Sequence, residues 1–136
     1  MNGSCVFCQI VQGIIPAHKI YEDEFTMAFM DKAPVSKGHV LIIPKDHYAL
    51  FEKMEKDDAR HLMATLQKVG KAVMKLPNVI AYNIRLNNGP GAGQVVEHVH
   101  FHIIPRYADD GLEDWKGQDY SDDEVRETRN LLIKSL

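Results

Sequence analysis

Three histidines alternate with apolar residues in the stretch His98-Val-His-Phe-His-Ile-Ile104. Residues two apart in a β-strand share a face, so His98, His100 and His102 are expected to line one side of a strand. Their rings would stand roughly 6–7 Å apart. A row of imidazoles is a poor packing surface, because burying a polar ring costs free energy and neighbouring imidazolium charges repel. Since histidine titrates near neutral pH, the pattern indicates chemistry rather than packing.

A glycine-rich loop, Asn87-Asn-Gly-Pro-Gly-Ala-Gly93, comes shortly before the histidines. Gly89, Gly91 and Gly93 let the backbone approach an anion closely, with amide hydrogens free to point at phosphate oxygens. By itself the loop could equally be a flexible turn. Because it leads into the histidines, the sequence predicts phosphate held against imidazole rings. No Gly-x-x-x-x-Gly-Lys-Ser/Thr motif occurs, so a P-loop nucleotide site is not expected.

Cys5 and Cys8 are the two cysteines of the chain. In a reducing compartment their spacing suits a metal site or a redox pair better than a structural disulfide. A redox pair of the thioredoxin kind should follow a strand, and only four residues precede Cys5. A metal half-site is therefore favoured, with a redox pair and two cysteines without a role as the alternatives.

Turn residues and hydrophobic periodicity predict the elements that position these groups. Strands are expected at residues 19–22, 25–30, 39–43, 81–86 and 95–104, and helices at 5–12, 57–76 and 122–134. Pro44 and Pro105 are expected to end the third and fifth strands. Strands joined by short turns, with one long helix inserted and a C-terminal helix, predict an α+β fold with a mainly antiparallel five-stranded sheet.

The helix at residues 57–76 has the clearest pattern. Its apolar side chains recur at three- and four-residue steps, which gives one stripe that can pack on a sheet. Asp57 or Asp58 is expected to cap the start of the helix, and Pro77 follows its end. The stripe consists of Leu62, Leu66, Val69, Val73 and Leu76.

Composition narrows the range of partners. The chain has 136 residues and a formal net charge of −3 at pH 7, which argues against the concentrated basic face that a nucleic acid requires. No apolar segment approaches the roughly 20 residues that a membrane helix needs. No basic stretch followed by a long apolar run marks a secretory signal. We therefore expect a single domain, residues 1–136, in the cytoplasm, with no nucleic-acid or membrane partner.

The histidine stretch matches the His-φ-His-φ-His-φ-φ signature (φ, apolar) of the histidine-triad (HIT) superfamily. The resemblance, to small bacterial-type members, covers residues 5–107, whereas 108–136 is expected to be a variable C-terminal segment. The other matching segments are Cys5-Val-Phe-Cys-Gln-Ile10, Ile15-Pro-Ala17, Tyr21-Glu-Asp23, Ala28-Phe-Met-Asp31, Gly38-His-Val-Leu-Ile-Ile-Pro-Lys45 with His47, and Ala92-Gly-Gln94. The resemblance implies a HIT-like α+β subunit that pairs into a homodimer, with the sheet continued across the interface. It also implies hydrolase or transferase activity on nucleotides.

By this resemblance, His100 is the catalytic nucleophile. A neutral imidazole attacks the α-phosphorus and forms a nucleotidyl-histidine intermediate that water resolves. To attack with one ring nitrogen, His100 must hold its proton on the other, which requires an acceptor nearby. His102 resembles the residue that contacts the phosphate and assists the leaving group. His39 resembles the fourth active-site histidine, which supports the orientation of the nucleophile.

The resemblance also implies a substrate pocket. Asn87 and Gln94 resemble donors of hydrogen bonds around the phosphate, beside the backbone of Gly93, and Asp31 resembles the carboxylate that accepts the ribose hydroxyls. Val95 stands where relatives often have serine or threonine, so one donor is lost and the leaving-group preference is open. By the same resemblance, the apolar walls of the base and sugar pocket are expected at Ile10, Phe29 and Leu41. These three residues also fit plain core positions.

A zinc site is the second implication. Cys5, Cys8, His47 and His98 resemble ligands found in a subset of relatives, including nucleotidyltransferases of sugar metabolism. Two thiolates and two imidazoles suit tetrahedral Zn²⁺. Because all four positions are filled, the metal would be structural and would hold His98 away from the chemistry. No catalytic metal is then required.

Three functions compete at this stage. The favoured one is metal-independent hydrolysis of a nucleoside phosphoramidate or a dinucleoside polyphosphate, with adenosine as the favoured nucleoside. The second makes His98, His100 and His102 ligands of a catalytic zinc, although such strand positions rarely converge on one ion. The third is a nucleotide-binding adaptor in which turnover is incidental.

Overall fold

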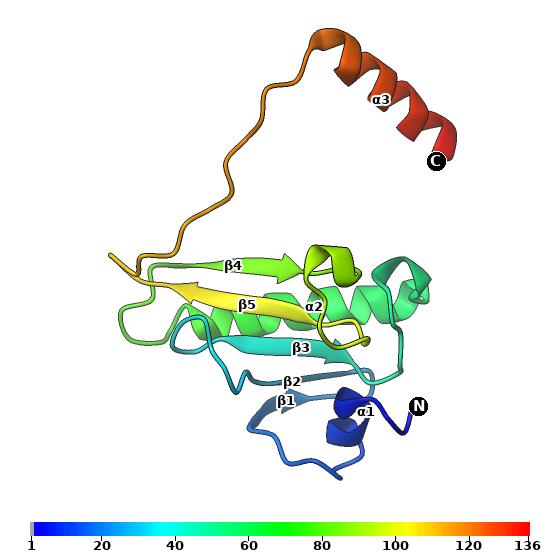
Figure 1. Ribbon diagram of the computed structural model, residues 1–136. Coiled ribbons are helices and arrows are strands. Elements are labelled where there is room, and N and C mark those ends of the chain that lie inside the picture. Colours follow the sequence, from blue (N-terminus) through cyan, green and yellow to red (C-terminus); the bar gives the residue numbers. More distant parts are fainter. Residues whose placement is uncertain (1) are drawn as a thin grey trace.

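Residues 2–136 are described by a computed structural model (Figure 1). The strands are β1 (Lys19–Glu22), β2 (Thr26–Met30), β3 (Val40–Pro44), β4 (Ala81–Leu86) and β5 (Phe101–Arg106). The helices are α1 (Val6–Val11), α2 (Lys56–Val73) and α3 (Asp122–Ser135), with short 3-10 turns at Phe51–Lys53 and Pro90–Ala92. All neighbouring strands pair antiparallel, in the order β1-β2-β3-β5-β4. The predicted α+β fold with a five-stranded antiparallel sheet is confirmed.

The sheet carries a different apolar cluster on each face, because its side chains alternate. On one face, Ala28, Ile42 and Ile103 pack against the apolar stripe of α2. On the other, Met27, Phe29, Leu41 and Ile43 pack with Cys5, Phe7 and Cys8 from α1 and the residue before it. Figure 1 shows α2 behind the sheet and α1 close to β1 and β2. The sheet therefore separates a structural core from a second face where α1 meets the histidines.

The long helix differs from its prediction at both ends. It begins after Glu55, and no side chain caps it; Asp58 instead accepts a hydrogen bond from the Tyr48 hydroxyl. It ends at Val73, so Leu76 lies beyond the helix and is 39% exposed. Pro77 disfavours helical backbone at Leu76, the residue before it, so the helix cannot continue to Leu76 as predicted. It ends at Val73, three residues before Leu76.

The fifth strand is shorter than predicted and lies further along the chain. Residues 95–100 precede β5 and are outside it, and the backbone N–H of Val99 donates to the Tyr48 carbonyl at 2.7 Å. Pro105 lies within β5, beyond its last pair with β3, where its carbonyl accepts a hydrogen bond from Ser36 Oγ at 2.6 Å. A proline is tolerated there because no residue of β3 pairs with Pro105, so the sheet loses no hydrogen bond to β3 through the missing N–H. Pro44 is likewise the last residue of β3.

The expected alternation of the histidine stretch survives this change. Val99, Phe101 and Ile103 belong to the cluster that packs against α2. The alternate residues His98 and His100 lie in edge contact with Phe7, on the α1 side. The extended backbone therefore sends the imidazoles to one side even before the regular strand begins.

The C-terminal segment leaves the body of the chain. Beyond Leu112, whose carbonyl accepts a hydrogen bond from Arg106, the chain runs outwards to α3, whose start carries a capping box between Ser121 and Glu124. Figure 1 shows α3 standing apart from the sheet, and every residue of α3 is exposed. Its exposed apolar side chains include Leu131, Leu132 and Ile133. A helix of this length is marginal in water without packing. Among residues 2–136, no helix is both long and apolar enough to cross a membrane.

Candidate active site and metal centre

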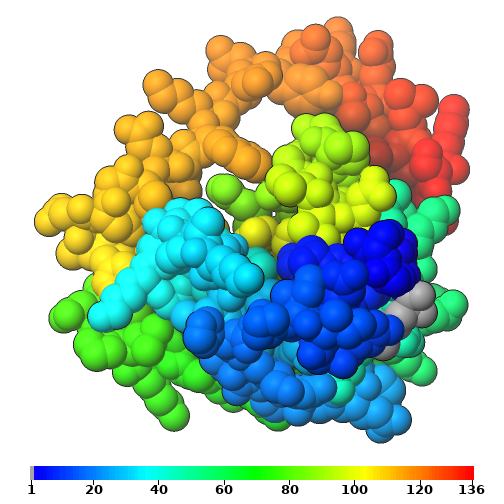
Figure 2. All heavy atoms as spheres, turned by 60° about the horizontal axis from the view of Figure 1, so that its bottom comes forward, coloured from blue at the N-terminus to red at the C-terminus, as the bar shows by residue number. Residues whose placement is uncertain are grey.

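A cavity of about 760 Å³ opens on the α1 side of the sheet. Its lining includes α1, the end of β2, the loop around Gly93, and the side chains of His100 and His102. Figure 2 shows the dark-blue N-terminal segment close to the yellow-green loop residues, with the cyan residues of the β2–β3 connection across from them. Segments far apart in sequence therefore meet around the two histidines.

His100 is oriented by a single hydrogen bond. Its Nδ1 lies 2.7 Å from the main-chain carbonyl oxygen of His98, which can only accept. The ring hydrogen must therefore sit on Nδ1, and Nε2 keeps its lone pair. Burial lowers the pKa of His100, so the ring is neutral near pH 7. A buried neutral imidazole with one committed N–H and one free lone pair has the form that a nucleophile needs.

His102 is held in the opposite tautomer through His39. The backbone N–H of Val35 donates to His39 Nδ1 at 3.1 Å, so His39 carries its hydrogen on Nε2. That nitrogen lies 2.9 Å from His102 Nδ1 and donates to it. The hydrogen of His102 is therefore on its own Nε2, where it can be donated to a ligand. Burial, with the nearby His100 and His39, lowers the pKa of His102 to about 4.

His39 thus contacts a different partner from the one expected. It was expected to support the nucleophile, yet its hydrogen bond goes to His102. Its Nε2 is also 3.6 Å from Asp31 Oδ2, but burial lowers the pKa of His39 and the ring is neutral. We conclude that His39 fixes the donor nitrogen of His102 and reaches His100 only indirectly.

The loop residues divide into two groups. Asn87, Gly93 and Val95 line the cavity, and Val95 is 90% exposed there. Gln94, expected to face the phosphate, is buried and points into its own loop. Its Oε1 accepts from Gly89 N at 2.7 Å, while its Nε2 donates to the carbonyls of Ala49 and Val96 at 2.8 and 3.0 Å. With these three bonds made, Gln94 shapes the loop and is not part of the cavity lining.

The expected sugar and base pocket residues lie at the cavity. Asp31 lines it and uses Oδ1 to accept the Ala33 N–H at 2.8 Å. The apolar walls expected from the sequence also line the cavity: Ile10, Phe29 and Leu41.

Sequence reasoning missed one aromatic wall of the cavity. Phe7 is buried, and its ring meets that of His100 edge-on at 5.1 Å between centroids. Its position between Cys5 and Cys8 is the only signal in the sequence, and there the cysteines suggested a metal site rather than a pocket wall. Further lining residues that were not assigned include Val6, Ile15, Met30 and Lys32.

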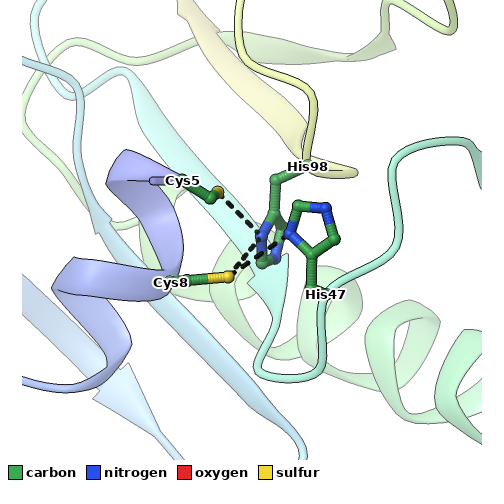
Figure 3. Close-up of side chains that lie close together, drawn as sticks. All are labelled: Cys5, Cys8, His47 and His98. Atoms are coloured by element: carbon green, nitrogen blue, oxygen red, sulfur yellow. Dashed lines mark hydrogen bonds between the residues drawn. The ribbon is translucent and has the colours of Figure 1, made fainter. Parts of the chain in front are cut away.

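Cys5, Cys8, His47 and His98 come together on the other side of α1 (Figure 3). Their ligand atoms all lie within 4.8 Å of one another. His98 Nδ1 is 3.5 Å from Cys5 Sγ and 3.6 Å from Cys8 Sγ, and His47 Nδ1 is 3.3 Å from Cys8 Sγ. Such spacing is compatible with four ligands around one ion, namely two sulfur atoms and two imidazole nitrogens.

The hydrogen-bond pattern of His98 provides a test of fit for a metal. Its Nε2 lies 2.8 Å from the Pro44 carbonyl oxygen and must donate there. Nδ1 therefore has a lone pair, and that lone pair faces the two thiols. A ligating histidine typically donates its other N–H to such an acceptor, which fixes the ring. The donor set of two sulfurs and two nitrogens suits Zn²⁺.

The geometry disfavours one zinc held by His98, His100 and His102. Each Nδ1 has a different neighbour: the thiols for His98, the His98 carbonyl for His100, and His39 for His102. In residues 2–136, two groups of side chains are close enough to hold an ion, and neither contains all three histidines. The second group, Asp31, His39 and His102, contains the hydrogen bond already described.

Comparison with known proteins identifies the family. A family model described as the HIT domain matches residues 12–109. The chain belongs to the histidine-triad family. A crystal structure of a HIT family protein from Bacillus anthracis superimposes on this HIT protein with a TM-score of 0.91 and 34% identity, covering 100% of this chain and 99% of that one.

Two further relatives bear on the site. An adenosine 5'-monophosphoramidase of Schizosaccharomyces pombe is 45% identical to this HIT protein over 103 residues, which is 76% of this chain and 74% of the relative. A Zn-bound histidine triad family protein from Mycobacterium smegmatis has 32% identity and a TM-score of 0.77, with 98% of each chain covered.

The neutral His102 makes the stability of this HIT protein depend on pH. Folding lowers the pKa of His102 from 6.5 to about 4, so the unfolded chain binds its proton more readily. The free energy of unfolding should keep the full His102 contribution above pH 6.5 and lose it progressively as the pH falls towards 4. Urea unfolding across this range should show a shallower loss for His102→Asn than for the wild type. His18→Asn, at an exposed histidine, is the control. Equal slopes for wild type and His102→Asn would contradict a neutral, half-buried His102.

Proposed function

We propose that this HIT protein hydrolyses a phosphorus linkage in a nucleotide, with His100 as the nucleophile. The observation that carries the proposal is the bond from His100 Nδ1 to the His98 carbonyl, which leaves a lone pair on Nε2 of a cavity-lining ring. The relative in Schizosaccharomyces pombe, named an adenosine 5'-monophosphoramidase, supports nucleotide hydrolysis in this family.

The reaction proceeds in two displacements at phosphorus. His100 Nε2 forms a bond to the α-phosphorus while the bond to the leaving group breaks, which gives a nucleotidyl-histidine. The positive charge that develops on the ring is shared through Nδ1–H with the His98 carbonyl. Water then attacks phosphorus and frees His100. Over both steps, water gives its hydroxyl to phosphorus and its proton to the leaving group.

The neighbouring residues have separate roles. His102 donates its Nε2–H to the phosphate or the departing atom, because His39 holds Nδ1. Asn87 and the backbone of Gly93 approach the phosphate from the loop, and Asp31 accepts the ribose hydroxyls. The apolar wall takes the base, for which adenine is the first choice. A nucleoside phosphoramidate is the leading substrate, and a dinucleoside polyphosphate is the second.

Val95 supports a second candidate function. Its exposed isopropyl group lies at the cavity but offers no hydrogen bond to a leaving group. Slow turnover would suit a nucleotide-binding adaptor in which hydrolysis is incidental. The two functions differ in whether the loss of hydrolysis alone abolishes the protein's role in the cell.

We also propose that Cys5, Cys8, His47 and His98 bind one structural Zn²⁺. The lone pair of His98 Nδ1 supports this site, as does the burial of both cysteines. Burial raises the pKa of the Cys8 thiol, and a bound cation would oppose that effect by stabilising the thiolate. The Zn-bound histidine triad family protein from Mycobacterium smegmatis supports this proposal.

A homodimer is the third part of the proposal, with the sheet continued through β4. β4 is an edge strand, and its Ile84 is 47% exposed. An exposed strand edge with apolar side chains is a template for pairing. The unpacked α3 at the end of the variable segment 108–136 also suits contact with a second chain.

His100→Ala should reduce hydrolysis of adenosine 5'-phosphoramidate at least about 10³-fold while binding of AMP stays close to that of the wild type. The lost atom is the nucleophile, whereas most of the cavity lining remains. Rates by liquid chromatography and affinity by calorimetry check this, with His61→Ala on α2 as the control. Mass spectrometry of a rapidly quenched reaction should find the nucleotidyl group on His100. Its presence on another residue would refute the mechanism.

The same variant tests the second candidate function. If the cellular phenotype survives His100→Ala, the adaptor function is correct.

Protein purified without a histidine tag should contain about one zinc per chain by elemental analysis. Cys5→Ala combined with Cys8→Ala should lose the metal, because both thiolate donors are gone. Ser4→Ala, next to Cys5, should retain it. Zinc-free wild-type protein, or zinc kept after both cysteines are replaced, would exclude the site.

Light scattering after size exclusion should give twice the 15.4 kDa of one chain. Ile84→Lys should favour the monomer because it places charges at the proposed strand pairing. Ile20→Lys on β1 is the matched control, since Ile20 is 48% exposed at the opposite edge of the sheet. A monomeric wild type, or dissociation caused by Ile20→Lys alone, would disprove the β4 interface.

A further inference from the structure

α1 is too short to hold its own position. It has six residues. Cys5 occupies the N-cap position, but its side chain forms no capping hydrogen bond. Helices shorter than about 12 residues are marginal in water by themselves. The buried side chains of this segment are Cys5, Phe7 and Cys8. The placement of α1 therefore depends on what these three side chains contact.

The three side chains connect the metal centre with the cavity. Cys5 and Cys8 lie within 3.6 Å of His98 Nδ1, at the proposed zinc site. Phe7, between them in sequence, lines the cavity, where Val6 and Ile10 of the same helix also lie. A shift of α1 at the thiols would therefore move a wall of the nucleotide pocket.

Phe7 also contacts the nucleophile. Its ring meets the His100 ring edge-on at 5.1 Å between centroids, and it packs at 5.6 Å against the ring of Phe29, which also lines the cavity. Edge-to-face contacts depend on ring orientation, so a shift of α1 would change the contacts that the Phe7 ring makes with His100 and Phe29.

His98 provides a second connection. Its side chain belongs to the metal centre, while its carbonyl oxygen accepts the Nδ1–H of His100. The same residue thus holds a ligand nitrogen on one side and the orienting acceptor of the nucleophile on the other. The sequence-based expectation that His98 is held away from the chemistry applies to its imidazole and not to its backbone.

We infer that metal binding at Cys5, Cys8, His47 and His98 raises the affinity of the cavity for a nucleoside monophosphate, with Phe7 as the positioning residue that couples the two sites. The inference rests on the proposed nucleotide and zinc sites. Coupling between sites is reciprocal: if zinc tightens AMP binding by some factor, AMP must tighten zinc binding by the same factor. We expect a factor of about 10, within the usual range for coupled sites.

The test measures both halves of this linkage. Calorimetry gives the Kd of AMP in the zinc-loaded and zinc-free protein, and circular dichroism checks that the zinc-free chain is folded. Competition with a chromogenic chelator gives the Kd of Zn²⁺ with and without saturating AMP. The two ratios should agree at about tenfold. Neither measurement depends on catalysis.

Phe7→Leu distinguishes coupling through this ring from coupling through folding alone. The variant should keep about one zinc per chain, bind AMP more weakly, and lower the coupling factor towards one. Phe25→Leu is the matched control, because the half-buried Phe25 stacks on His61, which is not a cavity-lining residue. It should retain the wild-type factor. If the zinc-free chain unfolds, zinc acts on AMP binding through folding, and the role of Phe7 is refuted.

Three further results would overturn the inference. A wild-type factor of one, with AMP bound equally by folded zinc-loaded and zinc-free protein, refutes the coupling and leaves the proposed function intact. A coupling factor in Phe7→Leu equal to that of the wild type refutes the role of Phe7. Failure of zinc-loaded protein to bind AMP at all refutes the proposed function, and the inference falls with it.

Discussion

The hydrogen bond from His100 Nδ1 to the His98 carbonyl is the contact on which the proposed chemistry of this protein depends. An imidazole that is free to exchange tautomers presents a lone pair or an N–H to the cavity in turn. Here a carbonyl that can only accept removes that freedom, and burial keeps the ring neutral. The acceptor belongs to the preceding histidine of the row, so the spacing that defines the family also supplies the group that orients its central member.

The same logic extends to the other histidines of the two sites, His39, His98 and His102. A main-chain group sets the tautomer at each starting point: the Val35 N–H for His39, and the Pro44 carbonyl for His98. His102 then takes its tautomer from His39. In the proposed function, neighbouring rings thus receive different tasks, namely nucleophile, donor and metal ligand, although the side chains are identical. Backbone geometry, rather than residue type, assigns the roles.

Prediction from sequence succeeded where the pattern is local. The alternation of the histidine stretch and the apolar stripe of α2 follow from the period of a strand or a helix, and both packed as expected. Prediction failed where a distant partner decides. The start of β5 depends on Tyr48, the role of Gln94 on Ala49, and the partner of His39 on the fold of β3 beside β5. Phe7 was missed for a related reason, since a pocket wall is defined by what lies opposite it in space.

Gln94 has a consequence for ligand binding that goes beyond its own position. Its side chain joins Gly89 of the glycine-rich loop to the main-chain carbonyls of Ala49 and Val96. The loop therefore has its shape before any phosphate arrives, although glycine is the residue that loses most backbone freedom when it is ordered. Little conformational entropy is left to lose on association, and more of the contact free energy remains as affinity. Gln94 thereby preorganises the loop that is proposed to bind the phosphate, although Gln94 itself does not line the cavity.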